Sequence, residues 1–322
     1  MLRVDDLRDA AARGFGLPAM ASCQLQRAFI NDIYRLDAEG RTWFLRIAPA
    51  GWRTVAQVEA EIGFLRSLIE AGAPVVEPVS RVEGSASVLT LDAPEGPRVA
   101  ALFFGAAGFE PLFSGNPDAL TIAHRYGRAS ARLHAVADQL PAIGGRPQMD
   151  LDFLLRDPLA VVIEQFGKGE ERDYLARLGD RLMAALSDAS LCWGFAHGDL
   201  NSSNILFRDE DETIIDFDCC GLGYRANDIA AFARGISLFH MPGAEASALL
   251  GAHLAGYREA YAIEPGDLAA LPAFLIVQRL WVASLHFQRQ GRFGLASFGP
   301  AYGARLMHSL RAWESVLDAP PD

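Results

Sequence analysis

The segment from His197 to Asp216, HGDLNSSNILFRDEDETIID, constrains the fold of this chain more than any other. Two short apolar runs, ILF and TII, flank a charged turn, which is typical of a β-hairpin. A hairpin brings its two ends together, so we expect Asn204, just before the first strand, and Asp216, just after the second, to be neighbours. Asp199 lies five positions before Asn204, on the preceding loop.

These three polar residues suit one kind of chemistry. A carboxylate and an amide oxygen are ligands that Mg²⁺ accepts, with phosphate oxygens and water completing the octahedron. Asp199 would then be placed to take a proton from a hydroxyl group. In the alternative interpretation, Asp199 and Asn204 only cap a turn. The joint pattern of Asp199, Asn204 and, after the hairpin, Asp216 favours a metal-bound phosphate site.

The first hundred residues alternate between strand and helix patterns. A capping-box sequence, Thr54 to Gln57, opens a helix whose apolar residues recur at helical spacing until Gly72 and Pro74. The other predicted elements are a helix over 2–13, strands over 26–36 and 41–47 joined by a turn at 37–40, and strands over 75–81 and 87–91.

Two charged residues stand out in this part of the chain. Alternation in the strand 41–47 places Arg46 among apolar neighbours, where a lone arginine is usually a surface residue whose stem covers apolar surface. The helix that follows carries Glu59 and Glu61, and one of them could pair with Arg46.

The run from Val99 to Gly108 joins an apolar strand to small residues. We interpret it as a linker between lobes, whose backbone N–H and C=O groups could meet a flat heterocycle. From here the pattern is mostly helical, with predicted helices over 122–140, 150–166, 173–186, 228–239, 246–261, 272–288 and 301–317. The prediction is an α+β fold with two lobes, 1–104 and 105–322.

Composition limits the function classes. The 322-residue chain has a formal net charge of −11, which argues against nonspecific nucleic-acid binding and against docking on an anionic membrane. Its four cysteines form no CxxC pair, and the N-terminus lacks an apolar core of signal-peptide length. We see no apolar run approaching about 18 residues. We therefore expect a reduced, cytoplasmic protein.

The sequence FAHGDLNSSNILFRDEDETIIDFDCCGLGYRANDIA resembles the signature of the aminoglycoside phosphotransferase and choline kinase superfamily. Gly198 in place of an arginine, the IDFD run and the turn from Gly221 to Tyr224 distinguish it from eukaryotic protein kinases. Within the superfamily it is most similar to the homoserine-kinase and bacterial stress-response-kinase branch. The resemblance implies a protein-kinase-like fold, with a small antiparallel-sheet lobe containing one main helix and a larger, mostly helical lobe.

The resemblance also implies roles for individual residues. Asp199 would be the catalytic base or the group that positions the acceptor hydroxyl, and Asp228 would brace the catalytic loop. The remaining roles are Mg²⁺ ligands at Asn204 and Asp216, a phosphate contact at Arg46 with its helix partner Glu61, and an adenine-binding hinge at Leu102, Phe104, Gly105 and Ala106.

Two departures from protein kinases are visible. Arg46 replaces the usual lysine, and a planar guanidinium meets phosphate differently from an ammonium group. The loop from Arg27 to Asp32 lacks the G-x-G-x-x-G pattern, as in the small-molecule branch of the superfamily.

The predicted function is an ATP- and Mg²⁺-dependent transfer of the γ-phosphoryl group to a hydroxyl of a small molecule. An amino alcohol, a hydroxy amino acid and an aminoglycoside-like compound all remain open as acceptors. The alternatives are a protein Ser/Thr kinase of the bacterial stress-response type and a nucleotide-binding pseudokinase. The helical half would decide between a peptide and a small molecule. The candidate pocket residues on its late helix are Gln278, Arg279, Trp281, His286 and Arg289, although we expect most of them to pack in the interior.

Overall fold

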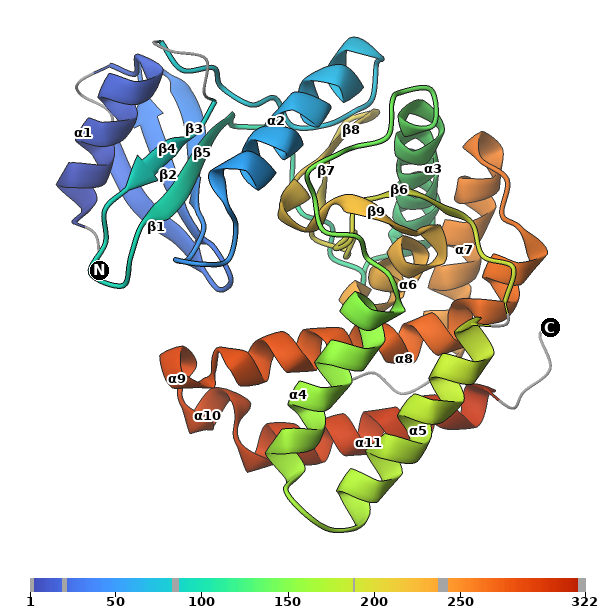
Figure 1. Cartoon of the computed structure of the whole chain (residues 1–322). Coiled ribbons are helices and arrows are strands. Elements are labelled where there is room, and N and C mark those ends of the chain that lie inside the picture. The colour runs from blue at the N-terminus through green and yellow to red at the C-terminus, as the bar shows by residue number, and fades with distance from the viewer. Residues whose placement is uncertain (1–2, 19–21, 83–86, 188, 237–242, 318–322) are drawn as a thin grey trace. The chain divides into compact units, whose positions relative to one another are not determined.

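The computed structural model describes residues 3–18, 22–82, 87–187, 189–236 and 243–317 (Figure 1). The chain forms two compact units. The first unit consists of residues 1–109, 143–146 and 206–218, and the second of residues 110–142, 147–205 and 219–322. Each unit thus draws on separate stretches of the chain. The division into lobes after residue 104 stays a prediction.

The first unit is built on a five-stranded antiparallel sheet in the order β1-β2-β3-β5-β4. Its strands are β1 (Ser22–Ala28), β2 (Asp32–Ala38), β3 (Arg41–Ile47), β4 (Leu89–Leu91) and β5 (Arg98–Phe104). The single strand expected over 26–36 is wrong. The chain turns after Ala28, where the N–H of Phe29 bonds to the carbonyl of Asn31, so that β1 and β2 form a hairpin.

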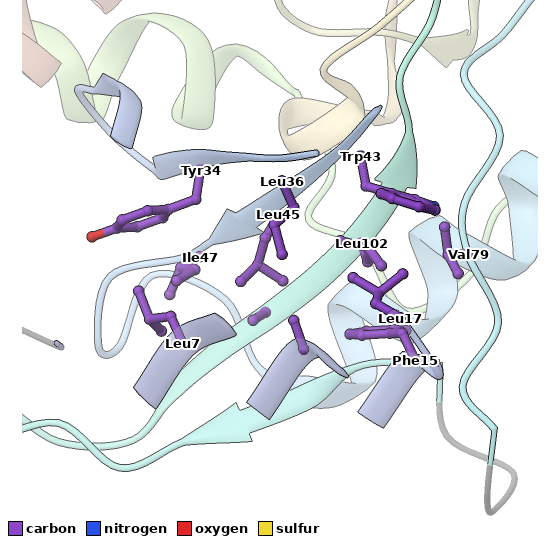
Figure 2. Close-up of a cluster of buried hydrophobic side chains, with 12 residues drawn as sticks. Leu7, Phe15, Leu17, Tyr34, Leu36, Trp43, Leu45, Ile47, Val79 and Leu102 are labelled. Carbon is purple, nitrogen blue, oxygen red and sulfur yellow. The ribbon is translucent and has the colours of Figure 1, made fainter. Parts of the chain in front are cut away.

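Helix α1 (Val4–Phe15) covers one face of this sheet (Figure 2). Its apolar residues Leu7 and Phe15 meet side chains that alternate along the strands, as the period of two requires. The fully or nearly buried members of this core are Leu7, Ala11, Phe15, Leu17, Tyr34, Leu36, Trp43, Leu45, Ile47, Val79, Ala100 and Leu102.

Helix α2 (Val55–Glu70) begins with the predicted capping box. Gln57 N–H donates to Thr54 Oγ1 at 3.2 Å, and Thr54 N–H donates to Gln57 Oε1 at 3.0 Å, which satisfies two of the donors that a helix start leaves unpaired.

The strand expected over 75–81 is wrong. That segment makes only isolated bridges, at Val75 and Pro78, because prolines cannot donate to a ladder. The strand expected over 87–91 shrinks to β4.

The predicted hairpin after Asn204 is confirmed as the two-stranded sheet of β7 (Ile205–Arg208) and β8 (Asp211–Ile214). Ile214 anchors β8 within the first unit. Its N–H donates to the carbonyl of Pro74 at 2.7 Å, and its carbonyl accepts from Val76 N–H at 2.9 Å. These bonds fix the strand that leads directly into Asp216.

The second unit is mostly helical. The long helix α8 (Pro265–Gln288) packs against α4, α5, α6 and α11 (Figure 1). Its other elements are α3 (Ala119–Ala137), a π-helical turn (Asp152–Arg156), α4 (Asp157–Phe166), α5 (Glu170–Ser187), β6 (Trp193–Ala196), β9 (Gly221–Tyr224), α6 (Arg225–Ile236), α7 (Ala244–Ala260), α9 (Gln290–Phe293), α10 (Leu295–Phe298) and α11 (Pro300–Leu317). A 3₁₀ turn (Phe217–Cys219) begins in the first unit and ends in the second. The predicted α+β class is confirmed.

Helix α8 starts seven residues before the predicted Pro272, with Pro265 in its first turn, where a missing N–H costs nothing. Among the described residues it is the one helix that is long and apolar enough, by length and mean hydropathy, to cross a membrane, although Gln278 and Arg279 interrupt its apolar run. Of its most apolar 18-residue window, 83% is buried inside the protein. The apolar character of α8 is thus accounted for by packing within the second unit.

Helices α3 and α7 cross closely at two glycines. A Cβ added at Gly127 would overlap the carbonyl oxygen of His253, and one added at Gly256 would overlap the carbonyl oxygen of His124. Both overlaps involve backbone atoms, which cannot turn aside as a side chain can. The two helices can pack at this distance only because neither position carries a side chain.

We expect Gly256→Ala to force α3 and α7 apart. The free energy of unfolding, measured by urea denaturation, should fall by about 3 kcal/mol, at the upper end of typical overpacking costs. Gly251→Ala on the same helix is the matched control, because a Cβ there meets nothing within 4 Å. The control should be neutral or slightly stabilising, as alanine favours helix over glycine. Equal effects of the two variants would contradict the close crossing.

His253 lies fully buried on α7, stacked on Phe232 with ring centroids 4.2 Å apart. Neither ring nitrogen has a hydrogen-bond partner among the described residues. Burial, with a smaller contribution from His134, lowers the pKa of His253 to about 3. The folded protein therefore holds this ring neutral, whereas the unfolded chain binds a proton near pH 6.5.

This difference predicts acid sensitivity. The stabilisation is complete above about pH 6.5 and is lost as the pH falls toward 3, because only the unfolded state gains the proton. Between pH 7.5 and pH 5, His253 should cost about 2 kcal/mol of stability. His253→Phe should remove that loss in urea unfolding at the two pH values, whereas His308→Gln, at an exposed position, should not. An unchanged pH dependence in His253→Phe would refute the assignment.

Candidate active site

The first unit contains a buried ion pair between two of the predicted site residues. Arg46 Nη2 on β3 donates to Glu61 Oε2 on α2 at 2.8 Å, and the two residues are 5% and 0% exposed. The usual surface position of a lone strand arginine does not apply here. Burial by itself would lower the pKa of Arg46, but the negative charge of Glu61, followed by that of Asp218 and Asp216, outweighs it and raises the pKa.

Asp218 is the centre of a second buried network in the first unit. Its carboxylate accepts from Trp52 Nε1 at 2.7 Å and pairs with Arg53 Nε at 3.3 Å. Arg53 and Arg146 also donate to its backbone carbonyl. Burial opposes ionisation, yet the charges of Arg46 and Arg53 and the bond from Trp52 prevail, so the pKa of Asp218 is lowered.

Sequence reasoning missed this network. The sequence feature that could have indicated it is the Trp52-Arg53 pair directly before the capping box. Two large side chains in a short loop are expected to pack against another part of the chain. Asp216, two residues before Asp218, is half-buried and adopts a left-handed backbone conformation with φ of 64°. A non-glycine residue in this conformation is uncommon and is often found at functional sites.

The predicted hinge lies at the end of β5. Leu102 is buried in the sheet core, and its carbonyl accepts from Val79 N–H at 2.8 Å. The N–H groups of Phe104 and Gly105 donate to the carbonyls of Glu77 and Thr42. Ala106 follows Gly105 directly, beyond the end of β5. The adenine-binding role of these residues stays a prediction.

In the second unit, Asp228 holds the predicted catalytic loop. It is fully buried, and its carboxylate accepts from the N–H groups of His197 at 2.6 Å and Gly198 at 2.8 Å. His134 Nε2 lies 3.1 Å from the same carboxylate, and His134 Nδ1 lies 2.6 Å from Tyr257 Oη. The bracing expected of Asp228 is confirmed, and His134 supports the same carboxylate from within the protein.

Gly198 explains why the arginine of protein kinases is absent from this loop. Its φ is +80°, and an added Cβ would lie 2.5 Å from the carbonyl oxygen of Cys219. Any side chain at this position would therefore be strained and would collide with backbone. The loop that leads to Asp199 is held by Asp228 on one side and packed tightly at Gly198.

Asp199 and Asn204 lie together in the second unit. Asn204 is 2% exposed, and its Nδ2 donates to the backbone carbonyl of Asp199 at 2.7 Å. This bond fixes the orientation of the amide and leaves its oxygen as the group that can accept a ligand. The side chain of Asp199 is 26% exposed. An amide oxygen and a half-buried carboxylate are therefore presented by one short loop.

Asp199 has a partner that sequence reasoning did not anticipate. Arg234 on α6 donates through Nη2 to Asp199 Oδ1, while its Nε donates to Gln278 Oε1 on α8 at 3.0 Å. The available signal was a single arginine after the apolar run from Ile229 to Ala233. Because Arg234 engages one carboxylate oxygen, the other, Oδ2, is the one that can accept from a substrate hydroxyl.

The side chains of the predicted site are of the kinds that bind a magnesium–nucleotide complex. Asn204 offers an oriented amide oxygen and Asp216 a carboxylate, both hard oxygen ligands. The first unit adds the Arg46 guanidinium, fixed by Glu61. Asn204 belongs to the second unit and Asp216 to the first, so their meeting at one metal stays a prediction.

The profile of the Phosphotransferase enzyme family matches residues 23–270. Two relatives match this chain over most of their length. An uncharacterised protein of Deinococcus radiodurans is 35% identical over 93% of this chain and 86% of its own length. An uncharacterised protein of Synechocystis is 26% identical over 95% of this chain and 84% of its own length.

Several solved structures share the fold. A microcompartment-associated aminopropanol kinase superposes with a TM-score of 0.81 at 24% identity, over 98% of both chains. The amicoumacin kinase hAmiN, solved with AMP-PNP, Ca²⁺ and its ligand Ami, has a TM-score of 0.76 at 20% identity, over 98% of this chain and 95% of its own. The likeness to kinases of small molecules extends over both units. Since the family profile covers most of the sequence, including Arg46, Asp199 and Asp216, this chain belongs to the phosphotransferase enzyme family.

Proposed function

We propose that this enzyme transfers the γ-phosphoryl group of ATP to a hydroxyl group of a small molecule, with Mg²⁺ as the metal. One observation carries the proposal. Asp199 sits on a loop that Asp228 fixes through two backbone N–H groups, with one carboxylate oxygen engaged by Arg234 and the other available to a hydroxyl. A rigidly held carboxylate of this kind can receive a proton in the transition state.

The first unit would bind the nucleotide. Arg46 would contact the phosphates, and Glu61 would keep its guanidinium in place. Leu102, Phe104, Gly105 and Ala106 would hold the adenine through backbone groups. These proposed roles fit phosphoryl transfer, which depends on positioning and charge neutralisation more than on covalent catalysis.

Asn204 and Asp216 would hold the metal. A magnesium ion held by these two residues would supply positive charge to offset the negative charge of the phosphate groups. Asn204 can do this because its amide is oriented by the bond to the Asp199 carbonyl. The acceptor oxygen would form the new bond to phosphorus as the bond to ADP breaks, and its proton would pass to Asp199.

A small-molecule acceptor is favoured over a peptide. Asp199 is only partly exposed, and the side chain of its partner Arg234 is 11% exposed, so the hydroxyl has to reach below the protein surface. The structural neighbours named above act on aminopropanol and amicoumacin according to their descriptions. The cytoplasmic location inferred from the sequence is part of this proposal.

The proposal predicts that Asp199→Asn lowers kcat by a factor of about 10²–10⁴, the usual contribution of a general base. Nucleotide affinity, measured by calorimetry, should stay close to that of the wild type, because Asp199 is not assigned to nucleotide binding. ADP release with an acceptor is the activity measurement. Asp209→Asn, in the exposed turn of the hairpin, is the matched control and should retain full activity. Near-normal turnover by Asp199→Asn would show that another group accepts the proton.

The same assay separates the alternatives. A screen of wild-type enzyme against amino alcohols, hydroxy acids, sugars, aminoglycosides and a generic protein substrate should give ADP release with a small molecule. Nucleotide binding without turnover on any acceptor would favour a pseudokinase, and turnover on the protein alone would favour a protein kinase.

A further inference from the structure

Arg279 on α8 is a buried cation that pairs with no acidic side chain among the described residues. The residue is 1% exposed, and its Nη1 donates to the carbonyl of Leu275 at 2.5 Å. Its Nε and Nη2 have no hydrogen-bond partner within the described residues. Leaving donors of a buried charged group unsatisfied is expensive, and the cost is typically tolerated where a ligand supplies the missing acceptor.

The guanidinium of Arg279 is fixed in place. Its Cζ lies 4.3 Å from the centre of the Trp313 ring, and the bond to Leu275 sets the plane of the group. Burial, with the nearby positive charge of Arg234, lowers the pKa of Arg279 to about 9. The group therefore stays cationic at neutral pH. The absence of any acidic contribution to this shift agrees with the absence of an acidic partner.

Arg279 is also linked to the catalytic loop. Its neighbour in sequence, Gln278, accepts a hydrogen bond from Arg234, and Arg234 in turn pairs with Asp199. His286 lies nearer the C-terminal end of α8. Burial, with a smaller contribution from the charge of Arg234, lowers the pKa of His286 to about 4. This ring is therefore neutral near pH 7. Arg234 pairs with the carboxylate of Asp199, and Arg279 lies close enough to Arg234 to feel its charge.

We propose that Arg279, together with Arg234, forms an anion-binding subsite for the phosphoryl acceptor, so that the acceptor is a small hydroxylated carboxylic acid. This inference rests on the proposed function and adds the class of substrate to it. The planar fork of an arginine matches a carboxylate with two parallel hydrogen bonds. The two unsatisfied donors Nε and Nη2 of Arg279 form such a fork. The acceptor hydroxyl would lie at Asp199 while its carboxylate is held at the arginines.

The proposal sets a preference between matched acceptors. L-serine, L-threonine and L-homoserine each differ from ethanolamine, 1-aminopropan-2-ol and 3-aminopropan-1-ol, respectively, by one carboxylate. We expect the wild type to have the higher kcat/KM for at least one carboxylate member, and the preference to come mainly from KM. Hydrogen bonds to charged groups are worth roughly 10- to 100-fold in binding, which sets the expected size.

Arg279→Met tests the assignment. The ratio of kcat/KM for the carboxylate member to that for the amino alcohol should fall roughly 10- to 100-fold, the value of one charged hydrogen-bonded contact. Nucleotide affinity should not change. Arg311→Met is the matched control, because Arg311 also stacks on an aromatic ring, that of Tyr174 at 5.1 Å, but lies exposed on α11. Its ratio should match that of the wild type.

Stability supplies a readout that separates a ligand-binding arginine from a structural one. Removing a buried cation with unsatisfied donors and filling its volume with methionine should leave Tm unchanged or raise it. A lower Tm together with an unchanged acceptor ratio would assign Arg279 to structure and overturn the proposal. A wild-type preference for the amino alcohols would overturn it as well.

Two further arms complete the test. Turnover of glycerol 3-phosphate is compared with that of glycerol, which tests for a phosphate-bearing acceptor. A preference confined to that pair would overturn the carboxylate assignment.

Calorimetry of the hydroxy acids with wild-type enzyme holding a non-hydrolysable ATP analogue and Mg²⁺ gives a readout without turnover. Nucleotide binding without any binding of a hydroxy acid would overturn this inference alone. A lack of Mg²⁺-dependent nucleotide binding would overturn the proposed function itself.

Discussion

The first unit depends on a buried positive charge. Arg46 lies beneath the surface of the sheet, and it is tolerable there because Glu61 meets it at 2.8 Å. Removing one member of such a pair typically costs about 3–5 kcal/mol, because the other is left as an unpaired buried charge. A hydrophobic pair could fill the same space, so stability alone does not explain the arginine. A fixed cation close to Asp216 and Asp218 is what a phosphate-binding unit needs.

The second unit contains a buried acidic side chain, that of Asp228, which also needs partners. Asp228 gains two backbone N–H donors and the ring of His134, and in return it holds the loop that presents Asp199. Gly198 allows the tight turn that brings those N–H groups to the carboxylate. The residues of the second unit that are proposed to take part in the reaction are thus held in place by buried groups. This arrangement matches catalysis by preorganised positions and charges.

Sequence reasoning succeeded where local rules act and failed where distant residues meet. The capping box at Thr54 and the hairpin before Asp216 follow from spacing and residue type. The residues alone left Glu59 and Glu61 open as partners of Arg46, and the family resemblance pointed to Glu61, which the structure confirms. The break between β1 and β2 was missed because apolar residues continue through the turn. The partners of Asp199 and Asp218 were missed because Arg234 is 35 positions from Asp199 and Arg53 is 165 positions from Asp218, and no periodicity encodes such contacts.

The central claim is that the polar residues flanking the hairpin bind a metal-bound nucleotide. The most direct test is to titrate a non-hydrolysable ATP analogue with and without Mg²⁺ into wild-type enzyme and Asp216→Asn by calorimetry. We predict that Mg²⁺ tightens binding to the wild type, and that Asp216→Asn loses this Mg²⁺ dependence while its metal-free affinity changes little. If Asp216→Asn shows the same Mg²⁺ dependence as the wild type, Asp216 is not a metal ligand and the account is contradicted.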